Sequence, residues 1–127
     1  MEQKFYICEK CGKMVAIVKD TKVPMMCCGQ PMKEIIPGTT EASLEKHLPV
    51  FEVKDNVVKV TVGSVKHPMI PEHYIEWVSL QTNDGNQRKV LMPGQEPEVC
   101  FTLCPGTKVE AVYAYCNLHS LWKTENK

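Results

Sequence analysis

The chain has 127 residues, enough for one ordinary domain or for a small module followed by a larger domain. Fifteen basic and fifteen acidic side chains cancel, so charge gives no reason to expect a nucleic acid or an anionic membrane as partner. No apolar run approaches the roughly 20 residues that span a bilayer, and the polar N-terminus is not typical of an export signal. The seven cysteines are therefore expected to be thiols or metal ligands and not disulfides.

The first expected element is a metal module at residues 1–37. It contains a Cys-x-x-Cys motif and, fifteen residues later, an adjacent pair: Cys8, Cys11, Cys27 and Cys28. Four thiolates complete a tetrahedron around one metal ion, which would stabilise a segment with few large apolar side chains. The spacing alone is typical of structural zinc. Side chains of neighbouring extended residues diverge, however, so the adjacent pair should distort the site, and such distortion matters to iron. Zinc and iron both remain open at this stage.

Beyond Pro49 the pattern is that of short strands separated by turns. Branched and aromatic residues are concentrated in six segments: 50–54, 57–63, 74–82, 88–92, 98–103 and 108–115. The Asp-Gly pair at residues 84–85 is a strong hairpin signal, because it accepts the positive φ angles of tight turns. No helical period is evident after residue 50. The sequence therefore predicts a mainly β protein, with an antiparallel β-sandwich over residues 38–127.

A second set of metal-binding side chains lies in this sandwich segment. It comprises all four histidines and one further cysteine: His47, His67, His73, Cys116 and His119. Each histidine alone is more simply a surface or hydrogen-bonded residue, but all four lie beside turns or strand ends, where a sandwich gathers its loops. Structural zinc takes four ligands, so five favour a metal of higher coordination, such as iron, with one position open. The backbone N–H groups of Leu118 and His119 are expected to donate to the Cys116 sulfur.

Three motifs in this segment resemble those of the desulfoferrodoxins, which are two-iron superoxide reductases. The motifs are Glu45-Lys46-His47-Leu48-Pro49, His67-Pro68-Met69 with His73-Tyr74-Ile75, and Cys116-Asn117-Leu118-His119. The N-terminal cysteine pattern is similar to the desulforedoxin-like domain of the same family. The resemblance covers essentially the whole chain, in the same order and without departure at a ligand position.

The resemblance implies a desulforedoxin-like iron module at residues 1–37 and an immunoglobulin-like superoxide reductase domain at residues 38–127. The four cysteines of the module would hold a distorted rubredoxin-type iron. In the second centre the four histidines would be equatorial ligands of another non-haem iron, with Cys116 as the axial thiolate. Glu45 would approach the open position in the ferric state, and Lys46 would be the cation beside it.

The resemblance also implies an activity, namely the one-electron reduction of superoxide to hydrogen peroxide in superoxide detoxification. The electrons would come from a donor such as rubredoxin, and the protein would be a cytoplasmic homodimer. Two other functions remain open from the residues alone: a plain electron carrier with an incidental histidine group, and a superoxide dismutase. A separate thiolate-only redox centre is easier to explain in a reductase. Cys100 and Cys104 belong to neither set, and we expect them to be buried apolar residues.

Overall fold

The computed structural model describes residues 2–126. It divides the chain into two compact units, Met1–Ile36 and Pro37–Lys127, called unit 1 and unit 2 below. Nearly all regular structure is β, which confirms the predicted fold class. Among the described residues, no helix has the length and apolar character needed to cross a membrane.

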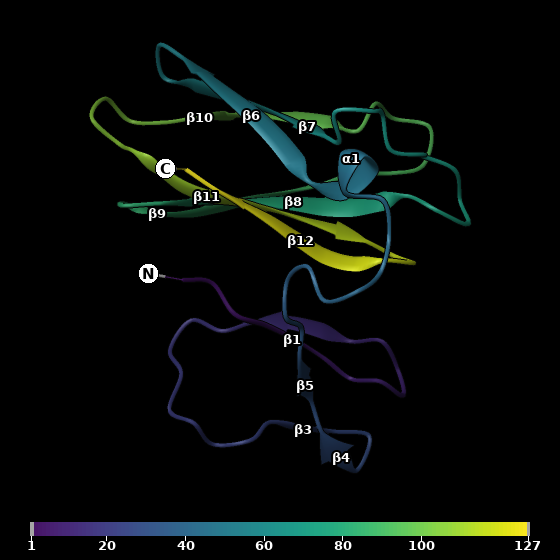
Figure 1. The fold of residues 1–127 in the computed structure, drawn as a ribbon. Coiled ribbons are helices and arrows are strands. Elements are labelled where there is room, and N and C mark those ends of the chain that lie inside the picture. The colour runs from purple at the N-terminus through teal and green to yellow at the C-terminus, as the bar shows by residue number, and fades with distance from the viewer. Residues whose placement is uncertain (1, 127) are drawn as a thin grey trace. The chain divides into compact units, whose positions relative to one another are not determined.

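Unit 1 is built from five short strands (Figure 1). They are β1 (Phe5–Ile7), β2 (Met14–Ala16), β3 (Met26–Cys27), β4 (Gln30–Pro31) and β5 (Lys33–Glu34). β1 lies between β2 and β5 in an antiparallel sheet, and β3 pairs with β4. The buried apolar side chains of the described part of this unit are Phe5, Cys8 and Ile35. So small a core agrees with the expectation that a metal supplies much of the folding free energy.

Unit 2 is an antiparallel β-sandwich (Figure 1). Its strands are β6 (Pro49–Lys54), β7 (Val57–Val62), β8 (Ile75–Thr82), β9 (Gly85–Val90), β10 (Glu98–Thr102), β11 (Val109–Cys116) and β12 (Ser120–Glu125). One sheet has the order β10-β7-β6 and the other the order β12-β11-β8-β9. The two inner faces share one apolar core, as the sequence predicted.

The side-chain alternation of β10 corrects one expectation. Val99 and Phe101 point into the core, so Cys100 between them points outward. Cys104, which follows the strand, is also exposed. The expectation that Cys100 and Cys104 are buried is therefore wrong, because strand register decides burial here and the apolar character of a thiol does not.

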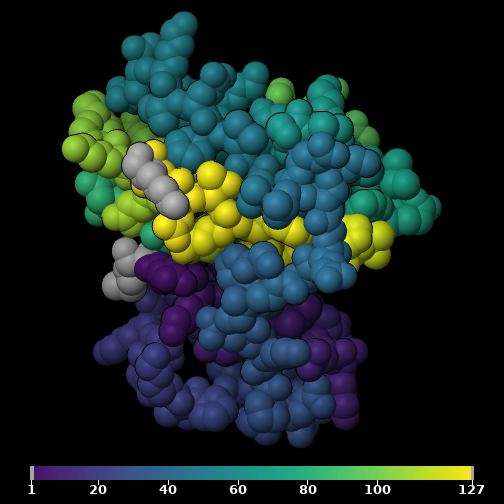
Figure 2. All heavy atoms as spheres, viewed as in Figure 1, coloured from purple at the N-terminus to yellow at the C-terminus, as the bar shows by residue number. Residues whose placement is uncertain are grey.

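Two elements of unit 2 were not predicted from the sequence. β12 pairs with β11 through a tight connection that begins after Cys116. A single helical turn, α1 (Leu44–His47), precedes β6. In the space-filling view α1, coloured blue, lies on the surface of unit 2, and its first three residues are exposed (Figure 2). The structure thus places His47 at the end of a helical turn and not at the start of a strand.

α1 docks against the turn that follows β7, and Gly63 makes this close approach possible. The N–H of Gly63 donates to the carbonyl of Leu48 (3.0 Å), and that of Val65 donates to the carbonyl of Glu45 (2.9 Å). The φ angle of Gly63 is +86°, and a Cβ atom there would lie less than 3.0 Å from the carbonyl oxygens of Val65, Lys46 and Glu45. A side chain at position 63 would therefore push α1 away from the sandwich.

Replacement of Gly63 by alanine should lower the free energy of unfolding of unit 2 more than the same replacement of Gly106. Gly106 has nearly the same φ, +87°, but open space around the added carbon. It therefore measures the backbone penalty alone, roughly 1 to 2 kcal/mol. At Gly63 the overlap should add about 1 to 3 kcal/mol. Urea unfolding of both variants checks this, and equal losses would contradict tight docking of α1.

Candidate metal centres

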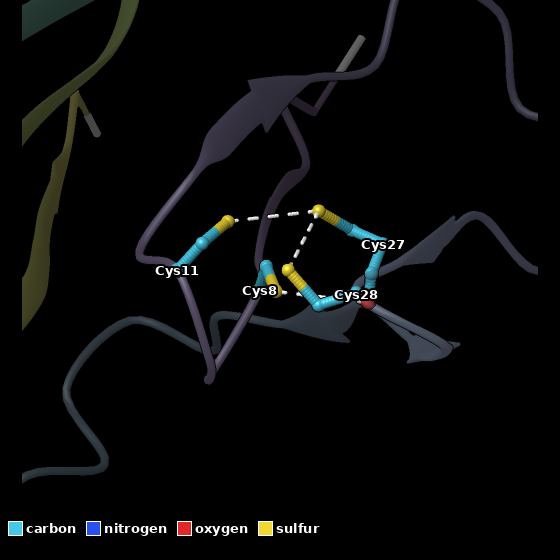
Figure 3. A group of neighbouring side chains, drawn as sticks. All are labelled: Cys8, Cys11, Cys27 and Cys28. Carbon is cyan, nitrogen blue, oxygen red and sulfur yellow. Dashed lines mark hydrogen bonds between the residues drawn. The ribbon is translucent and has the colours of Figure 1, made fainter.

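The four cysteines of unit 1 converge on one point (Figure 3). Their sulfur atoms all lie within 4.8 Å of one another. The Cys11 sulfur is 3.6 Å from the Cys27 sulfur, which is 3.9 Å from the Cys28 sulfur. Cys8 is buried, whereas Cys11 and Cys28 are exposed. The structure thus brings together the four residues that the spacing predicted, in a group with one side open to solvent.

Backbone geometry explains how two adjacent cysteines serve one site. Cys27 ends β3 in an extended conformation, but Cys28 has a φ of +52° and Gly29 follows at +76°. This left-handed turn directs both sulfurs to the same side, where two extended residues would diverge (Figure 3). A left-handed conformation at a residue other than glycine costs on the order of 1 to 3 kcal/mol. The strain expected from the sequence therefore lies in the backbone at Cys28.

The protonation equilibria of these thiols favour a bound cation. Backbone N–H groups, that of Cys11 foremost, lower the pKa of Cys8 to about 6. The neighbouring side chains of Cys11 and Cys8 raise the pKa of Cys27 to about 12. The four sulfurs cannot all ionise at this separation unless a positive ion balances them. Four thiolates around one ion suit a transition metal such as iron or zinc.

The second group lies in unit 2, where the ligand atoms of His47, His67, His73 and Cys116 all fall within 4.8 Å of one another. His119 joins them, because its Nδ1 atom lies 3.1 Å from Nε2 of His47 and 3.8 Å from the sulfur of Cys116. The five residues come from the end of α1 (His47), the loop between β7 and β8 (His67 and His73), the end of β11 (Cys116) and the turn between β11 and β12 (His119). The structure therefore gathers all five predicted side chains.

The four imidazole rings form a nearly square cycle. Neighbouring ring centres are 4.6 to 5.0 Å apart, and their planes are inclined at 72° to 82°. Across the cycle the centres of His47 and His73 are 6.3 Å apart. Packing between aromatic side chains has no need of such a cycle. It is the arrangement in which four ring nitrogens point at one central ion.

Hydrogen bonds at Nδ1 of His47 and of His67 leave the Nε2 atoms of these two rings unprotonated. Nδ1 of His47 is 2.7 Å from the Ser43 carbonyl oxygen, and Nδ1 of His67 is 2.7 Å from that of Pro68. A carbonyl oxygen only accepts, so both Nδ1 atoms carry the proton and both Nε2 atoms present lone pairs. These Nε2 atoms face each other at 3.2 Å. Within residues 2–126, Nε2 of His73 is buried without a hydrogen-bond partner. A metal ion satisfies all three nitrogens.

Burial favours the neutral form of His47, His67 and His73, which is the form that binds metals. It lowers the pKa of His47 and of His73, and it lowers the pKa of His67 to about 4. Burial also raises the pKa of the Cys116 thiol, while the backbone N–H groups of Leu118 and His119 act in the opposite direction by hydrogen bonding to its sulfur. The amide donors expected from the sequence are therefore present. The donor set fits a transition metal that accepts both nitrogen and sulfur, such as iron.

Trp122 supports two of these histidines, a role that the sequence did not reveal. Its ring stacks on that of His47, with centres 5.0 Å apart and planes inclined at 27°. Its Nε1–H group donates to the carbonyl of His119 (3.0 Å). The signal for this role that the sequence offered was the position of Trp122, three residues after His119.

Glu45 and Lys46 lie on α1 with exposed side chains. The carboxylate of Glu45 does not belong to the group of clustered ligand atoms in the described chain. The Lys46 ammonium lies near enough to add, after burial and the neighbouring rings, to the lowering of the pKa of His47 and His73. α1 thus holds one carboxylate and one cation beside the second centre.

Comparison with known proteins agrees with both centres. The sequence model of the desulfoferrodoxin family matches residues 39–125. The desulfoferrodoxin of Syntrophotalea carbinolica is 42% identical over 94% of each chain, and a desulfoferrodoxin homolog of Archaeoglobus fulgidus is 45% identical over 94% of each chain. The solved structure of superoxide reductase from Treponema pallidum superposes with a TM-score of 0.83 and 37% identity, over 98% of both chains. The chain therefore belongs to the desulfoferrodoxin family.

Proposed function

We propose that this protein is a superoxide reductase. In the reaction, superoxide takes up one electron and two protons and becomes hydrogen peroxide. The observation that carries the proposal is the square of four imidazoles with a cysteine sulfur beside it. Five donors on a six-coordinate ion leave one position for a small ligand. Superoxide reductases are also among the solved structures that resemble this chain.

We assign residues 1–37 to a desulforedoxin-like tetrathiolate iron module and residues 38–127 to an immunoglobulin-like superoxide reductase domain. The division of the fold after Ile36 supports this assignment. Each part would hold one non-haem iron. In the module the ligands are Cys8, Cys11, Cys27 and Cys28. In the sandwich His47, His67, His73, His119 and Cys116 would hold the iron.

The iron of the second centre, when bound, supplies the electron by passing from the ferrous to the ferric state. The Cys116 thiolate donates electron density toward the metal, and the amides of Leu118 and His119 moderate that donation through their hydrogen bonds to its sulfur. His47, His67 and Cys116 are buried, so bulk water is excluded from the part of the site that these ligands form.

The two charged side chains of α1 have separate catalytic roles in this proposal. Lys46 attracts the superoxide anion and stabilises the negative charge that develops on it. The Glu45 carboxylate would close the open position once a bound iron is ferric. The carbonyl of Glu45 accepts the N–H of Val65, which lies in the turn after β7. This bond holds the backbone of α1, which carries both residues.

We further propose an external electron donor such as rubredoxin, a cytoplasmic location and a homodimeric assembly. The exposure of Cys11 and Cys28 supports the first point, because a donor protein can approach the tetrathiolate centre closely there. None of the seven cysteines, all of which lie in the described part of the chain, forms a disulfide, which suits a reducing compartment. The homodimer rests on family resemblance.

The stoichiometry of the reaction tests the function. With a superoxide source, reduced rubredoxin and no catalase, each superoxide consumed should yield one peroxide and one oxidised donor. A dismutase converts two superoxide ions into one peroxide and one oxygen and leaves the donor reduced. Superoxide removal at full rate without a donor, accompanied by oxygen release, would show that the protein is a dismutase.

Replacement of Cys28 by serine should abolish the tetrathiolate spectrum and leave metal content and spectrum of the second centre unchanged. The reason is that each donor set is complete within its own unit. Metal analysis and visible spectroscopy check this. Cys104→Ser is the matched control, since Cys104 is also exposed but belongs to neither group. Loss of both metals from Cys28→Ser would contradict two independent centres.

Replacement of Lys46 by isoleucine should slow the encounter with superoxide by about tenfold and flatten its dependence on ionic strength, because the cation acts through screened attraction. Pulse radiolysis at several salt concentrations measures both effects. Lys54→Ile removes the same charge from an exposed position of β6 and is the control for overall charge. Glu45→Ala should leave the encounter rate nearly unchanged and alter the ferric spectrum. Equal slowing in the two lysine variants would argue against a local role for Lys46.

A further inference from the structure

His73 differs from the other ring ligands in the way it is held. His47 and His67 are each oriented by a ring nitrogen 2.7 Å from a backbone carbonyl oxygen. His119 is oriented through the short turn that it shares with Cys116. For the ring of His73, no hydrogen bond is found within residues 2–126, and its Nε2 atom is buried. The direction of this ring therefore depends on the backbone that carries it.

That backbone is bound on both sides of His73 by one residue, Asn117. The N–H of Asn117 donates to the carbonyl of Tyr74 (3.2 Å), and its Oδ1 atom accepts the N–H of Tyr74 (2.9 Å). Its Nδ2–H group donates to the carbonyl of Glu72 (3.1 Å). Asn117 is also covalently adjacent to Cys116. Three hydrogen bonds thus connect the segment of one ligand to the segment of another.

The sheet cannot make this connection itself. The pairing of β8 with β11 is irregular between Tyr115 and Cys116, and the regular ladder ends there. The side-chain amide of Asn117 offers a donor and an acceptor, as a peptide group does. It therefore extends the pairing beyond the bulge, where the backbone itself contributes the bond from the Asn117 N–H to the carbonyl of Tyr74.

Local backbone bonds of His73 do not replace this connection. His73 and Ile70 exchange two backbone hydrogen bonds, of 3.0 and 3.1 Å. These bonds close the tight loop between them, but they do not connect the loop to the turn that follows Cys116. The bonds of Asn117 make that connection.

We propose that Asn117 is a positioning residue of the second centre. It holds the loop of His73 at a fixed distance from the turn of Cys116 and His119, so that the His73 ring completes the square of imidazoles. Asn117 is not a member of the ligand group. The inference rests on the proposed ligation of a metal by these residues, and it does not depend on the reaction with superoxide.

The test is Asn117→Asp in the full chain, loaded with Co²⁺ as the probe. The carboxylate keeps the acceptor for the Tyr74 N–H but cannot donate to the carbonyl of Glu72. Loss of a residue that orients a ligand should weaken Co²⁺ binding at the second centre by about 10- to 100-fold. Chelator competition measures the affinity. Paramagnetically shifted imidazole N–H signals in the proton NMR spectrum report this centre alone, because the first centre has no histidine.

Asn126→Asp is the matched control. Asn126 binds the other end of β11 in the same manner, with its N–H on the carbonyl of Glu110 (2.9 Å) and its Nδ2–H on that of Val109 (2.9 Å). It should cost comparable stability and leave Co²⁺ affinity and the shifted signals unchanged. If Asn117→Asp does not fold, Asn117→Ala removes both side-chain bonds, to Tyr74 and to Glu72, without adding a charge.

The outcomes separate the inference from the proposed function. Normal Co²⁺ affinity and unaltered shifted signals in both Asn117 variants, with normal binding by the unmodified protein, would overturn the positioning role alone. Equal loss of affinity in the Asn117 and Asn126 variants would reduce the effect to general stability and would also overturn it. Failure of the unmodified protein to bind Co²⁺ through imidazoles would overturn both.

Discussion

The structure depends on donor atoms that meet at distances where they repel one another. Nε2 of His47 and Nε2 of His67 face each other at 3.2 Å with their protons on the far nitrogens. The sulfurs of unit 1 crowd together in a similar way. Donors that have lost water and gained no partner are unfavourable. The free energy of binding a cation at either site therefore also stabilises the fold around it.

The two units hold their donors by different means. Unit 2 has a continuous apolar core that fixes the ends of its strands, and the ligands project from the loops and turns at those ends. Carbonyl groups of Ser43 and Pro68, the ring of Trp122 and the amide of Asn117 then set the direction of individual rings. Unit 1 has a far smaller core, so the metal itself is a principal cross-link there.

The sequence predicted the donor sets and most strands of unit 2, because ligand chemistry and β patterning are local properties of the chain. It did not predict α1, since a single turn has no helical period, or β12, whose connection contains ligands and not a usual turn pair. The error at Cys100 has a similar origin, because register comes from pairing with β7. The supporting roles of Trp122 and Asn117 depend on contacts between segments that are distant in the chain. Such contacts cannot be recognised in a single sequence.

The unequal exposure of the ligands has a kinetic consequence. Cys11 and Cys28 face solvent, whereas His47, His67 and Cys116 are buried. A chelator can displace exposed thiolates one at a time, but it reaches the buried donors after local opening of the sandwich. The first centre should thus exchange its metal faster than the second. Thiols freed in this way are open to oxidation, and oxidised sulfur no longer binds a metal. The integrity of the first centre therefore depends on the redox state of its surroundings, while the second centre is protected by its fold.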